Sequence, residues 1–405
     1  MSNFWSLVGF EYKKILRKRS VQAALLLAVL VTAFSVCGTL LGNYYVNGEV
    51  YESNYEAMVR DRAYERALAG RKLDEKLIAE AVNAYAKIPD SDRYSDTVEY
   101  QTFARPYSAV YSLVRAIYNM ESAPFGMTDF QTLTEERADQ LYEARRDKQV
   151  KLVEATNMSE QAKDSVLALD AQIETPFTIA YTDGYARFFV AIYTFGLTAA
   201  FVMAICIAPL FSGEYASGAD QLILASKHGK NKLIGAKLFT GFSLAAAISL
   251  VLTTVGYFLS LFLFGFDGAD VPLQLYMPMS PYPLTMKQTA LILATCAFFA
   301  CLMTAAITML LSARLKSPFG VIILVGLLLI VPMFLFVPET NITLYNLFHL
   351  LPTNMMAIWG AAAEIQYELF GLVIKPCVFL PVFAAVISIL LTPFAYRSFK
   401  KHQIV

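Results

Sequence analysis

The chain has 405 residues, of which 57% are hydrophobic and only 16% are charged, a balance that soluble globular proteins seldom reach. The formal net charge is zero, so the charge balance gives no sign of a nucleic-acid partner and we expect none. This composition argues against an ordinary soluble domain and predicts an integral membrane protein.

Six uncharged stretches are long enough to cross a membrane, since about 20 helical residues span roughly 30 Å of hydrocarbon. None of them contains Asp, Glu, Lys, Arg or His. Ion-coupled carriers usually hold such a residue at mid-membrane, so this absence argues against a proton- or sodium-driven carrier. We expect an α-helical polytopic membrane protein with six transmembrane helices, at residues 21–42, 188–210, 238–266, 288–311, 319–337 and 377–396.

Basic residues are distributed unevenly among the segments that join these stretches. If the N-terminus is cytoplasmic, the inner segments hold 14 Lys and Arg residues and only three acidic ones. The short outer loops 267–287 and 338–376 hold one lysine each. An excess of Lys and Arg marks the cytoplasmic side of a membrane protein. We therefore expect a multi-pass protein with both termini in the cytoplasm.

Residues 1–20 combine aromatic and aliphatic side chains with a basic run, just before the first transmembrane helix at 21–42. A helix of this composition lies along the inner membrane surface, with its apolar side in lipid and its basic side toward the headgroups. We expect a cytoplasmic amphipathic elbow helix at 1–20, with membrane lipid as a partner. A generic basic anchor for the first span would explain the same composition, and this alternative stays open.

Residues 43–187 form a polar insertion between the first and second spans, with 25 acidic and 17 basic residues, and must fold outside the membrane. Apolar residues recur in it at helical spacing. We expect a large, mainly helical extracytoplasmic domain at 43–187. The insertion holds 14 of the 23 tyrosines, which either fill the core between thin helices, the interpretation we favour, or line a binding surface. The clearest helical run is Leu73, Leu77, Ile78, Ala81, Val82 and Tyr85.

Residues 188–405 contain the other five spans and two further elements. The inner segment 211–237 is longer than a hairpin between spans needs, and its apolar Leu222 and Ile223 predict a short amphipathic docking helix at 212–232. An ordinary polar connector is the alternative. The outer segment 341–372 is semi-apolar but interrupted by Pro352, which suits two half-helices that enter the outer leaflet.

The chain contains no recognisable catalytic or nucleotide-binding motif. Its three histidines and five cysteines form no metal-ligand pattern, and no glycine-flanked serine nucleophile occurs. The only Gly-Lys pair, Gly229-Lys230, is followed by Asn231 and lacks the preceding glycine of a phosphate-binding loop. We expect no enzyme activity and no cofactor in this chain, so any ATP hydrolysis must come from a partner.

Two cytoplasmic motifs resemble those of a known family, the permeases of ABC-2-type ATP-binding-cassette exporters. Such permeases have an elbow helix with a Glu-x-Lys-Lys pattern, which Glu11-Tyr12-Lys13-Lys14 matches. The loop after their second span carries a glutamate, a glycine four residues on, a leucine-rich stretch ending in serine, and a basic residue before a Gly-x-Lys that enters the third span. The matching positions here are Glu214, Gly218, Leu222, Leu224, Ser226, Lys230 and Lys237.

This resemblance implies an arrangement of subunits and a function. Two six-span permeases, as a homodimer or with a sister permease, would sit over two copies of a separate cytoplasmic ABC ATPase that binds ATP and magnesium. The complex would export substrate across the plasma membrane of a bacterium, with antimicrobial peptides, drugs, lipids and sodium as substrate classes. The implied ATPase-coupling residues are Glu214, Gly218, Leu222, Ser226 and Lys230 in the helix at 212–232, and Glu11, Lys13 and Lys14 in the elbow helix.

The main alternative is a membrane-anchored sensor or scaffold whose extracytoplasmic domain binds a ligand or partner. Such a protein would have no need of a docking helix at 212–232. A channel is a third alternative, but its pore would need a polar lining, and the spans offer only scattered Thr and Ser.

Overall fold

The computed structural model describes residues 2–89, 91, 93–120, 123–226 and 229–401. The chain divides into two compact units. The long-helix unit comprises residues 1–36, 188–259 and 291–405, and the insertion unit comprises residues 37–187 and 260–290. Residues 260–290, of which the sequence analysis assigned 267–287 to a short outer loop and the flanking residues to spans, therefore fold with the insertion.

Five segments are long and apolar enough to cross a membrane. A helix satisfies its backbone hydrogen bonds internally, which is why apolar sequence of this length adopts it in lipid. α1 (Ser2–Leu16) precedes the first of the five. The five are α2 (Arg19–Cys37) with the 3₁₀ turn η1 (Gly38–Leu40), α10 (Asp183–Ile207) with α11 (Pro209–Ser217), α13 (Lys232–Phe264), α14 (Met286–Arg314) and α19 (Pro376–Lys400).

The predicted span at 319–337 is shorter than expected. It forms α15 (Pro318–Ile330), a 13-residue helix, followed by the 3₁₀ turn η6 (Val331–Phe334). Pro332 has no N–H to continue the α-helical ladder, and its ring crowds the carbonyl four residues earlier, so the α-helix ends just before it. The expectation of an α-helical membrane protein is thus confirmed, with five of the six predicted spans at full length in the described residues.

The segment predicted to form two half-helices contains three short helices and a β-hairpin. The helices are α16 (Ile342–His349), α17 (Pro352–Met355) and α18 (Ile358–Ala361). Strands β3 (Tyr367–Leu369) and β4 (Leu372–Ile374) pair antiparallel, with Leu369 opposite Leu372. The two turn residues between them, Phe370 and Gly371, both have positive φ, as a tight two-residue hairpin turn requires. Phe370 gave no sequence signal for such a turn, because bulky residues seldom adopt this conformation.

The insertion unit is mainly helical, as expected. It opens with an antiparallel hairpin of β1 (Asn43–Val46) and β2 (Glu49–Ser53), and residues 260–290 contribute η5 (Leu273–Leu275). The insertion's longer helices are α3 (Asn54–Leu68), α4 (Glu75–Tyr85), α5 (Ser108–Tyr118), α8 (Leu141–Glu154) and α9 (Glu160–Asp170). Its shorter ones are η2 (Tyr94–Asp96), the π-helical turn η3 (Tyr100–Ala104), η4 (Arg105–Tyr107), α6 (Met127–Gln131) and α7 (Glu135–Asp139).

Tyrosine fills the core of this unit, as the favoured interpretation expects. Tyr85 is fully buried, with its ring centroid 4.9 Å from that of Tyr111 and 5.1 Å from that of Phe130. Rings at these separations add attraction beyond the apolar area they bury. Other tyrosines, including Tyr45 and Tyr55, are exposed. The tyrosine-rich composition therefore reflects packing in part and surface in part.

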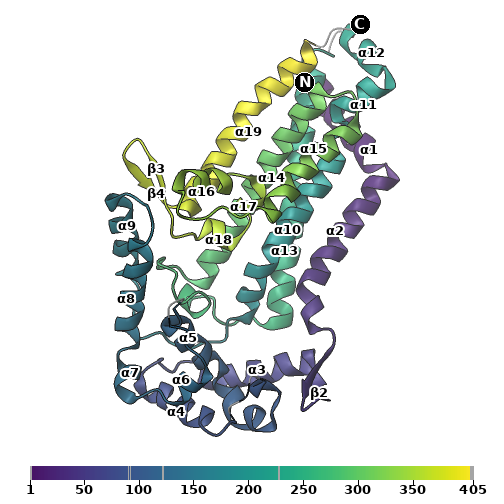
Figure 1. Cartoon of the computed structure of the whole chain (residues 1–405). Helices are drawn as coiled ribbons and strands as arrows, with labels where there is room; N and C mark the ends of the chain where they lie inside the picture. The colour runs from purple at the N-terminus through teal and green to yellow at the C-terminus, as the bar shows by residue number, and fades with distance from the viewer. Residues whose placement is uncertain (1, 90, 92, 121–122, 227–228, 402–405) are drawn as a thin grey trace. The chain divides into compact units, whose positions relative to one another are not determined.

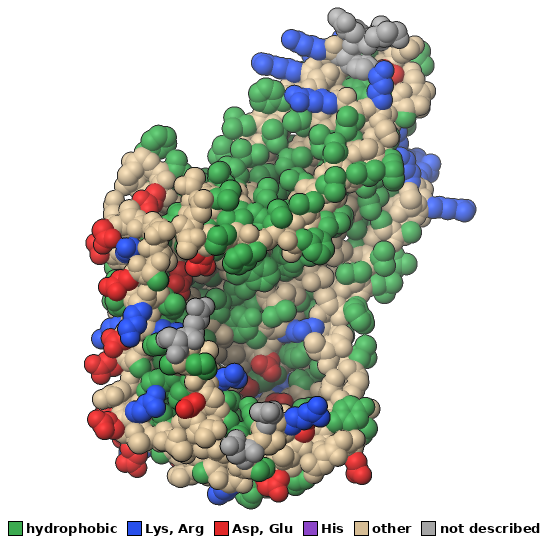
Figure 2. Space-filling model, viewed as in Figure 1, with side chains coloured by type: hydrophobic (Ala, Val, Ile, Leu, Met, Phe, Trp, Pro, Cys, Tyr) green, Lys and Arg blue, Asp and Glu red, His purple; other side chains and the backbone are tan. Residues whose placement is uncertain are grey.

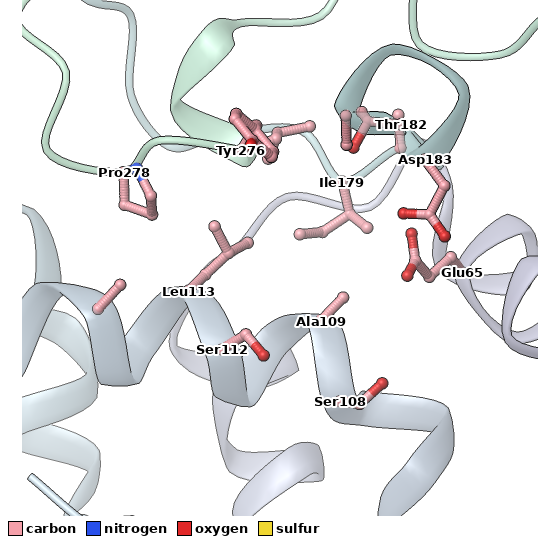
Figure 3. Close-up of a pocket in the computed structure, with 14 residues that line it drawn as sticks. Glu65, Ser108, Ala109, Ser112, Leu113, Ile179, Thr182, Asp183, Tyr276 and Pro278 are labelled. Carbon is pink, nitrogen blue, oxygen red and sulfur yellow. The ribbon is translucent and has the colours of Figure 1, made fainter. Parts of the chain in front are cut away.

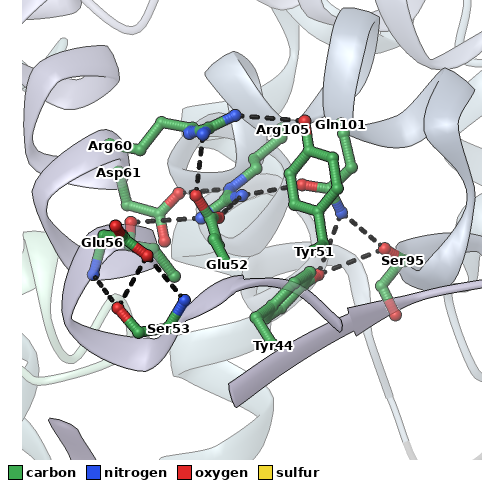
Figure 4. A network of polar contacts seen from close by, with 11 residues as sticks. Tyr44, Tyr51, Glu52, Ser53, Glu56, Arg60, Asp61, Ser95, Gln101 and Arg105 are labelled. Atoms are coloured by element: carbon green, nitrogen blue, oxygen red, sulfur yellow. Dashed lines mark hydrogen bonds and ion pairs between the residues drawn. The ribbon is translucent and has the colours of Figure 1, made fainter. Parts of the chain in front are cut away.

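Two buried arginines tie the insertion unit together. Arg105 is 3% exposed, and its guanidinium lies 2.5 Å from Glu52 Oε1 and 2.6 Å from Asp61 Oδ1, which joins β2, α3 and η4 (Figure 4). Arg145 of α8 lies 2.8 Å from Asp170 Oδ1 of α9 and donates a hydrogen bond to the Pro278 carbonyl oxygen at 2.8 Å. Arg145 thus links the insertion to residues 260–290.

Replacing Arg145 with Met should destabilise the insertion unit, because Asp170 would stay buried without its partner. Breaking a buried ion pair from one side costs about 3–5 kcal/mol. Arg71→Met is the matched control, since the Arg71–Glu80 pair is partly exposed and such a pair contributes at most about 1 kcal/mol. Thermal unfolding of the purified full chain in detergent measures both. Equal losses in the two variants would contradict the structural role given to Arg145.

Candidate functional site

One end of the long-helix unit gathers α1, α11, α12 (Ala219–Ala225), the first turns of α13 and the last turns of α19 (Figure 1). The ring of Phe399 in α19 packs against Phe211 and Tyr215 of α11, with centroids 4.9 and 5.6 Å apart. The Tyr396 hydroxyl donates a hydrogen bond to the Lys230 carbonyl oxygen at 3.2 Å. These contacts hold the end of α19 against the segment 211–237, one of the two motifs that the sequence analysis singled out.

A buried lysine lies at the centre of this end. Lys237 of α13 has no exposed surface, and its ammonium nitrogen is 2.9 Å from Glu11 Oε1 and 2.6 Å from Glu214 Oε1. It also donates to the Leu210 carbonyl oxygen at 2.9 Å. An ammonium has three N–H groups, and these three acceptors satisfy all of them. Lys14 of α1 pairs with the same Glu214 oxygen.

These four side chains form the coupling cluster: Glu11 and Lys14 of α1, Glu214 of α11 and Lys237 of α13. Two positive and two negative charges make it neutral overall. Glu11 is 2% and Glu214 is 4% exposed, so both carboxylates are shielded from water. Their negative charges are therefore stabilised by the lysine partners. Removing one partner from such a buried arrangement leaves an uncompensated charge. The cluster therefore ties α1, α11 and α13 into one arrangement.

Aromatic and hydroxyl contacts also hold α1 against α13. The ring of Trp5 is 5.4 Å and that of Phe4 is 6.2 Å from the ring of Phe239, measured between centroids. The Tyr12 hydroxyl donates a hydrogen bond to Ser243 Oγ at 2.6 Å. The helix predicted at 1–20 is thus present as α1, and one of its faces is covered by α13.

The docking helix predicted at 212–232 is divided into α11 and α12. Gly218 between them has φ +70°, a left-handed conformation, and its N–H bonds to the Glu214 and Tyr215 carbonyl oxygens. Such a glycine commonly ends a helix, because a side chain is strained there. The described part of 212–232 therefore forms two helices that meet at a bend at Gly218, where the sequence analysis expected a single short helix. Residues 227–228 lie outside the described residues.

α12 presents an apolar side chain to its surroundings. Leu222 is 79% exposed, whereas Leu224, two positions on, is 5% exposed. Ile223, which the sequence analysis placed with Leu222 on the apolar side of the docking helix, is partly buried, whereas Leu222 points outward. Ser226 and Lys230 are exposed as well, and Ser226 Oγ bonds back to the Ile223 carbonyl oxygen at 2.8 Å.

Apart from Gly218, which forms the bend between α11 and α12, the predicted site residues fall into two groups. Glu11, Lys14 and Glu214 meet at Lys237, which the sequence analysis placed in the motif but not among the site residues. A lysine at the entrance of an otherwise apolar helix was the signal that could have found it. The exposed group does not reach Lys237 and comprises Leu222, Ser226, Lys230 and Lys13.

A second feature is a cavity of about 300 Å³ inside the insertion unit. The carboxyl groups of Glu65 in α3 and Asp183 at the start of α10 point toward each other at one end of it (Figure 3). Burial, reinforced by the negative charges of Asp183 and Asp61, raises the pKa of Glu65 to about 8. Across the described residues, no group of three or more His, Cys, Asp or Glu side chains is placed to hold a metal ion.

Comparison with known proteins identifies the class. Residues 57–392 match the family described as "ABC-2 family transporter protein", which covers most of the chain. No curated protein and no solved structure gave a significant match. The chain belongs to the ABC-2 family of transporter proteins. It is therefore a membrane-embedded permease subunit of an ABC transporter, a class that works with a separate ABC ATPase.

Lys237→Met tests the coupling cluster. It would leave Glu11 buried without a partner, and we expect a loss of about 3–5 kcal/mol, measured as a lower melting temperature of the purified chain. Lys13→Met, an exposed lysine one position from Lys14, should change little. The double variant Lys237→Met/Glu11→Gln should recover part of the loss, because it removes the unpaired charge. A Lys237→Met protein as stable as the unchanged chain would contradict the cluster.

Glu65 gives a prediction for pH. A carboxyl whose folded pKa is raised keeps its proton while the unfolded chain loses it, so stability falls as pH rises from about 4.5 to about 8. Glu65→Gln removes this titration. Its melting temperature should match that of the unchanged chain near pH 4.5 and exceed it increasingly toward pH 8. Glu75→Gln, an exposed carboxyl at the start of α4, should show no such trend, and a flat difference for Glu65→Gln would refute the assignment.

Proposed function

We propose that this permease belongs to an ATP-driven exporter and that its ATPase acts on α12. The observation that carries the proposal is the buried coupling cluster, which joins α1, α11 and α13 beside a helix with an exposed leucine. An exposed apolar side chain on a short projecting helix suits insertion into a pocket of a partner protein. Leu222 would be that anchor.

The cluster offers a path from α12 into the membrane-spanning helices. A push on α12 would move α11, because Gly218 alone separates them. α11 cannot shift independently of α1 and α13 unless the pairs of Lys237 with Glu11 and Glu214 break inside an apolar environment. That separation is costly. Displacement of α11 would therefore carry α13 with it.

The site residues then have two roles. Leu222, Ser226, Lys230 and Lys13 are exposed and would contact the ATPase. Glu11, Lys14, Glu214 and Gly218 would act as positioning residues, the first three through Lys237 and the last by setting the bend between the helices. This division revises the expectation that Glu11 and Glu214 themselves touch the ATPase, since a carboxylate with almost no exposed surface cannot reach a partner directly.

The topology and assembly follow the sequence analysis. Both termini and α12 would lie in the cytoplasm, the insertion unit outside the cell, and α15 with η6 would form the sixth crossing. Two permeases would pair over two ATPase subunits that bind ATP and magnesium, in the plasma membrane of a bacterium. Antimicrobial peptides, drugs, lipids and sodium remain the proposed substrate classes. Family membership favours this function over the sensor or scaffold alternative, whose spans would serve only as anchors.

Leu222→Asp tests the docking role of α12. The change places a charge where an apolar anchor is proposed, so the co-purified ATPase should be lost or its hydrolysis should no longer depend on the permease. Export should stop while membrane insertion stays normal. The measurements are ATPase recovery with the tagged permease from its native host, and substrate efflux from those cells.

The matched control is Leu372→Asp, the same change at another exposed leucine, 66% exposed, in β4. It should leave ATPase recovery unchanged. If Leu222→Asp retained the ATPase and export at the level of this control, α12 would not be the docking element.

A further inference from the structure

A groove runs along the long-helix unit between α13, α14 and α19, with a volume of about 450 Å³. Part of its lining is open to the surroundings, since Phe239 is 43% and Ile389 is 70% exposed. The residues that line it are Phe239, Phe242, Ser243 and Ala246 of α13, Phe299 and Leu302 of α14, and Ala385, Ser388, Ile389 and Thr392 of α19.

The hydroxyl groups in this groove are already satisfied. Ser388 Oγ donates to the Ala384 carbonyl oxygen at 2.7 Å, and Thr392 Oγ1 donates to the Ser388 carbonyl oxygen at 2.7 Å. Ser243 Oγ donates to the Phe239 carbonyl oxygen at 2.6 Å and accepts from Tyr12. A polar ligand group would find few partners here and would lose its water. The groove therefore suits a hydrocarbon chain.

One end of the groove is basic. α13 begins and α19 ends there, and the bond from Tyr396 to the Lys230 carbonyl oxygen joins the two ends. Arg397 lies five residues beyond Thr392, about 7 Å along the helix axis, and Lys232 lies about 10 Å before Phe239. Figure 2 shows Lys and Arg side chains at the end that carries α12 and the last turns of α19. Four exposed basic residues belong to this end: Lys230, Lys232, Arg397 and Lys400.

These four side chains lack an acidic partner. None of them forms an ion pair with another described residue. The inner segments contain only three acidic residues, Glu11, Glu214 and Asp220, and all three are at most 6% exposed. A second copy of the chain would therefore bring no acidic surface from its own inner segments to this place. An anion attached to a hydrocarbon chain fits both features.

We propose that the groove binds an acyl chain of an anionic phospholipid, with the phosphate group against Lys232, Arg397 and the neighbouring basic residues. Lys and Arg near a membrane surface attract anionic headgroups by about 1 kcal/mol each. The bound chain would lie against Phe239 and Ser243, the two groove residues that also contact α1. The lipid would thus stabilise the packing of α1 against α13, next to the coupling cluster.

Tryptophan fluorescence tests this site directly. The chain has two tryptophans, and Trp359→Phe leaves only Trp5, whose ring is 5.4 Å from that of Phe239. Delipidated full-length protein in detergent is titrated with phosphatidylglycerol or phosphatidylcholine that carries bromine on the acyl chains, which quenches nearby tryptophan. We expect saturable quenching by the phosphatidylglycerol at about one lipid per chain. The phosphatidylcholine should bind at least tenfold more weakly than the phosphatidylglycerol. The measurement needs neither ATPase nor substrate, so its result is independent of the export proposal.

Three variants in this background separate the outcomes. Lys232→Gln/Arg397→Gln should weaken phosphatidylglycerol binding about 30-fold, the effect of losing about 2 kcal/mol. Arg314→Gln/Lys316→Gln removes the same charge at and just beyond the end of α14, about three turns past Leu302, and should have no effect. Ala246→Phe should abolish saturable quenching by filling the groove.

Equal quenching by both lipids, or binding unchanged in the Lys232/Arg397 variant, would overturn the proposal even if Ala246→Phe failed to fold. If neither lipid quenched Trp5, and if Ala246→Phe changed the number of chains in the purified particle, the groove would be a contact between copies of the chain instead.

Discussion

The arrangement of α1, α11 and α13 depends on one buried ammonium group. Lys237 has no contact with water, so its charge is tolerable only while Glu11, Glu214 and the Leu210 carbonyl oxygen surround it. These acceptors come from two other helices, and the requirement to keep them in place holds α1 and α11 against α13. The left-handed Gly218 then ends α11, and Leu222 on the following helix α12 is exposed.

The insertion unit solves a similar problem with arginine. Arg105 and Arg145 each bring together segments that are distant in sequence, and each is buried with acidic partners. A guanidinium offers five donors in a fixed plane and so can bond two or three acceptors at once. The long-helix unit instead uses a lysine, whose three donors suit a meeting point of three acceptors. Membership of the ABC-2 family gives the long-helix unit a context, since a permease subunit of this family works with a separate ABC ATPase.

Much of the fold was predictable because it follows from local chemistry. Apolar length predicted the spans, and helical spacing around Leu77 and Tyr85 predicted the helices of the insertion. Two features depended on distant partners and could not be predicted. Residues 260–290 join the insertion through Arg145, and Glu214 faces inward because Lys14, 200 positions earlier, and Lys237 pair with it. The early end of the span at 319–337 is a local effect instead, because Pro332 stands inside the predicted span. Sequence spacing predicts that a carboxylate lies on a helix. Which face of that helix is buried depends on the helices that pack against it.

The division of the chain into two units has a consequence for how such a protein is varied. The chain passes between the units four times, and each passage falls inside a helix: before the last residue of α2, and within α10, α13 and α14. An insertion carried on flexible linkers could be exchanged or deleted as a module. Here any replacement of the insertion unit would have to begin and end inside helices, so each exchange would have to leave those helices unbroken. The insertion and the helices that carry it are therefore expected to change together in related proteins, as one inherited piece.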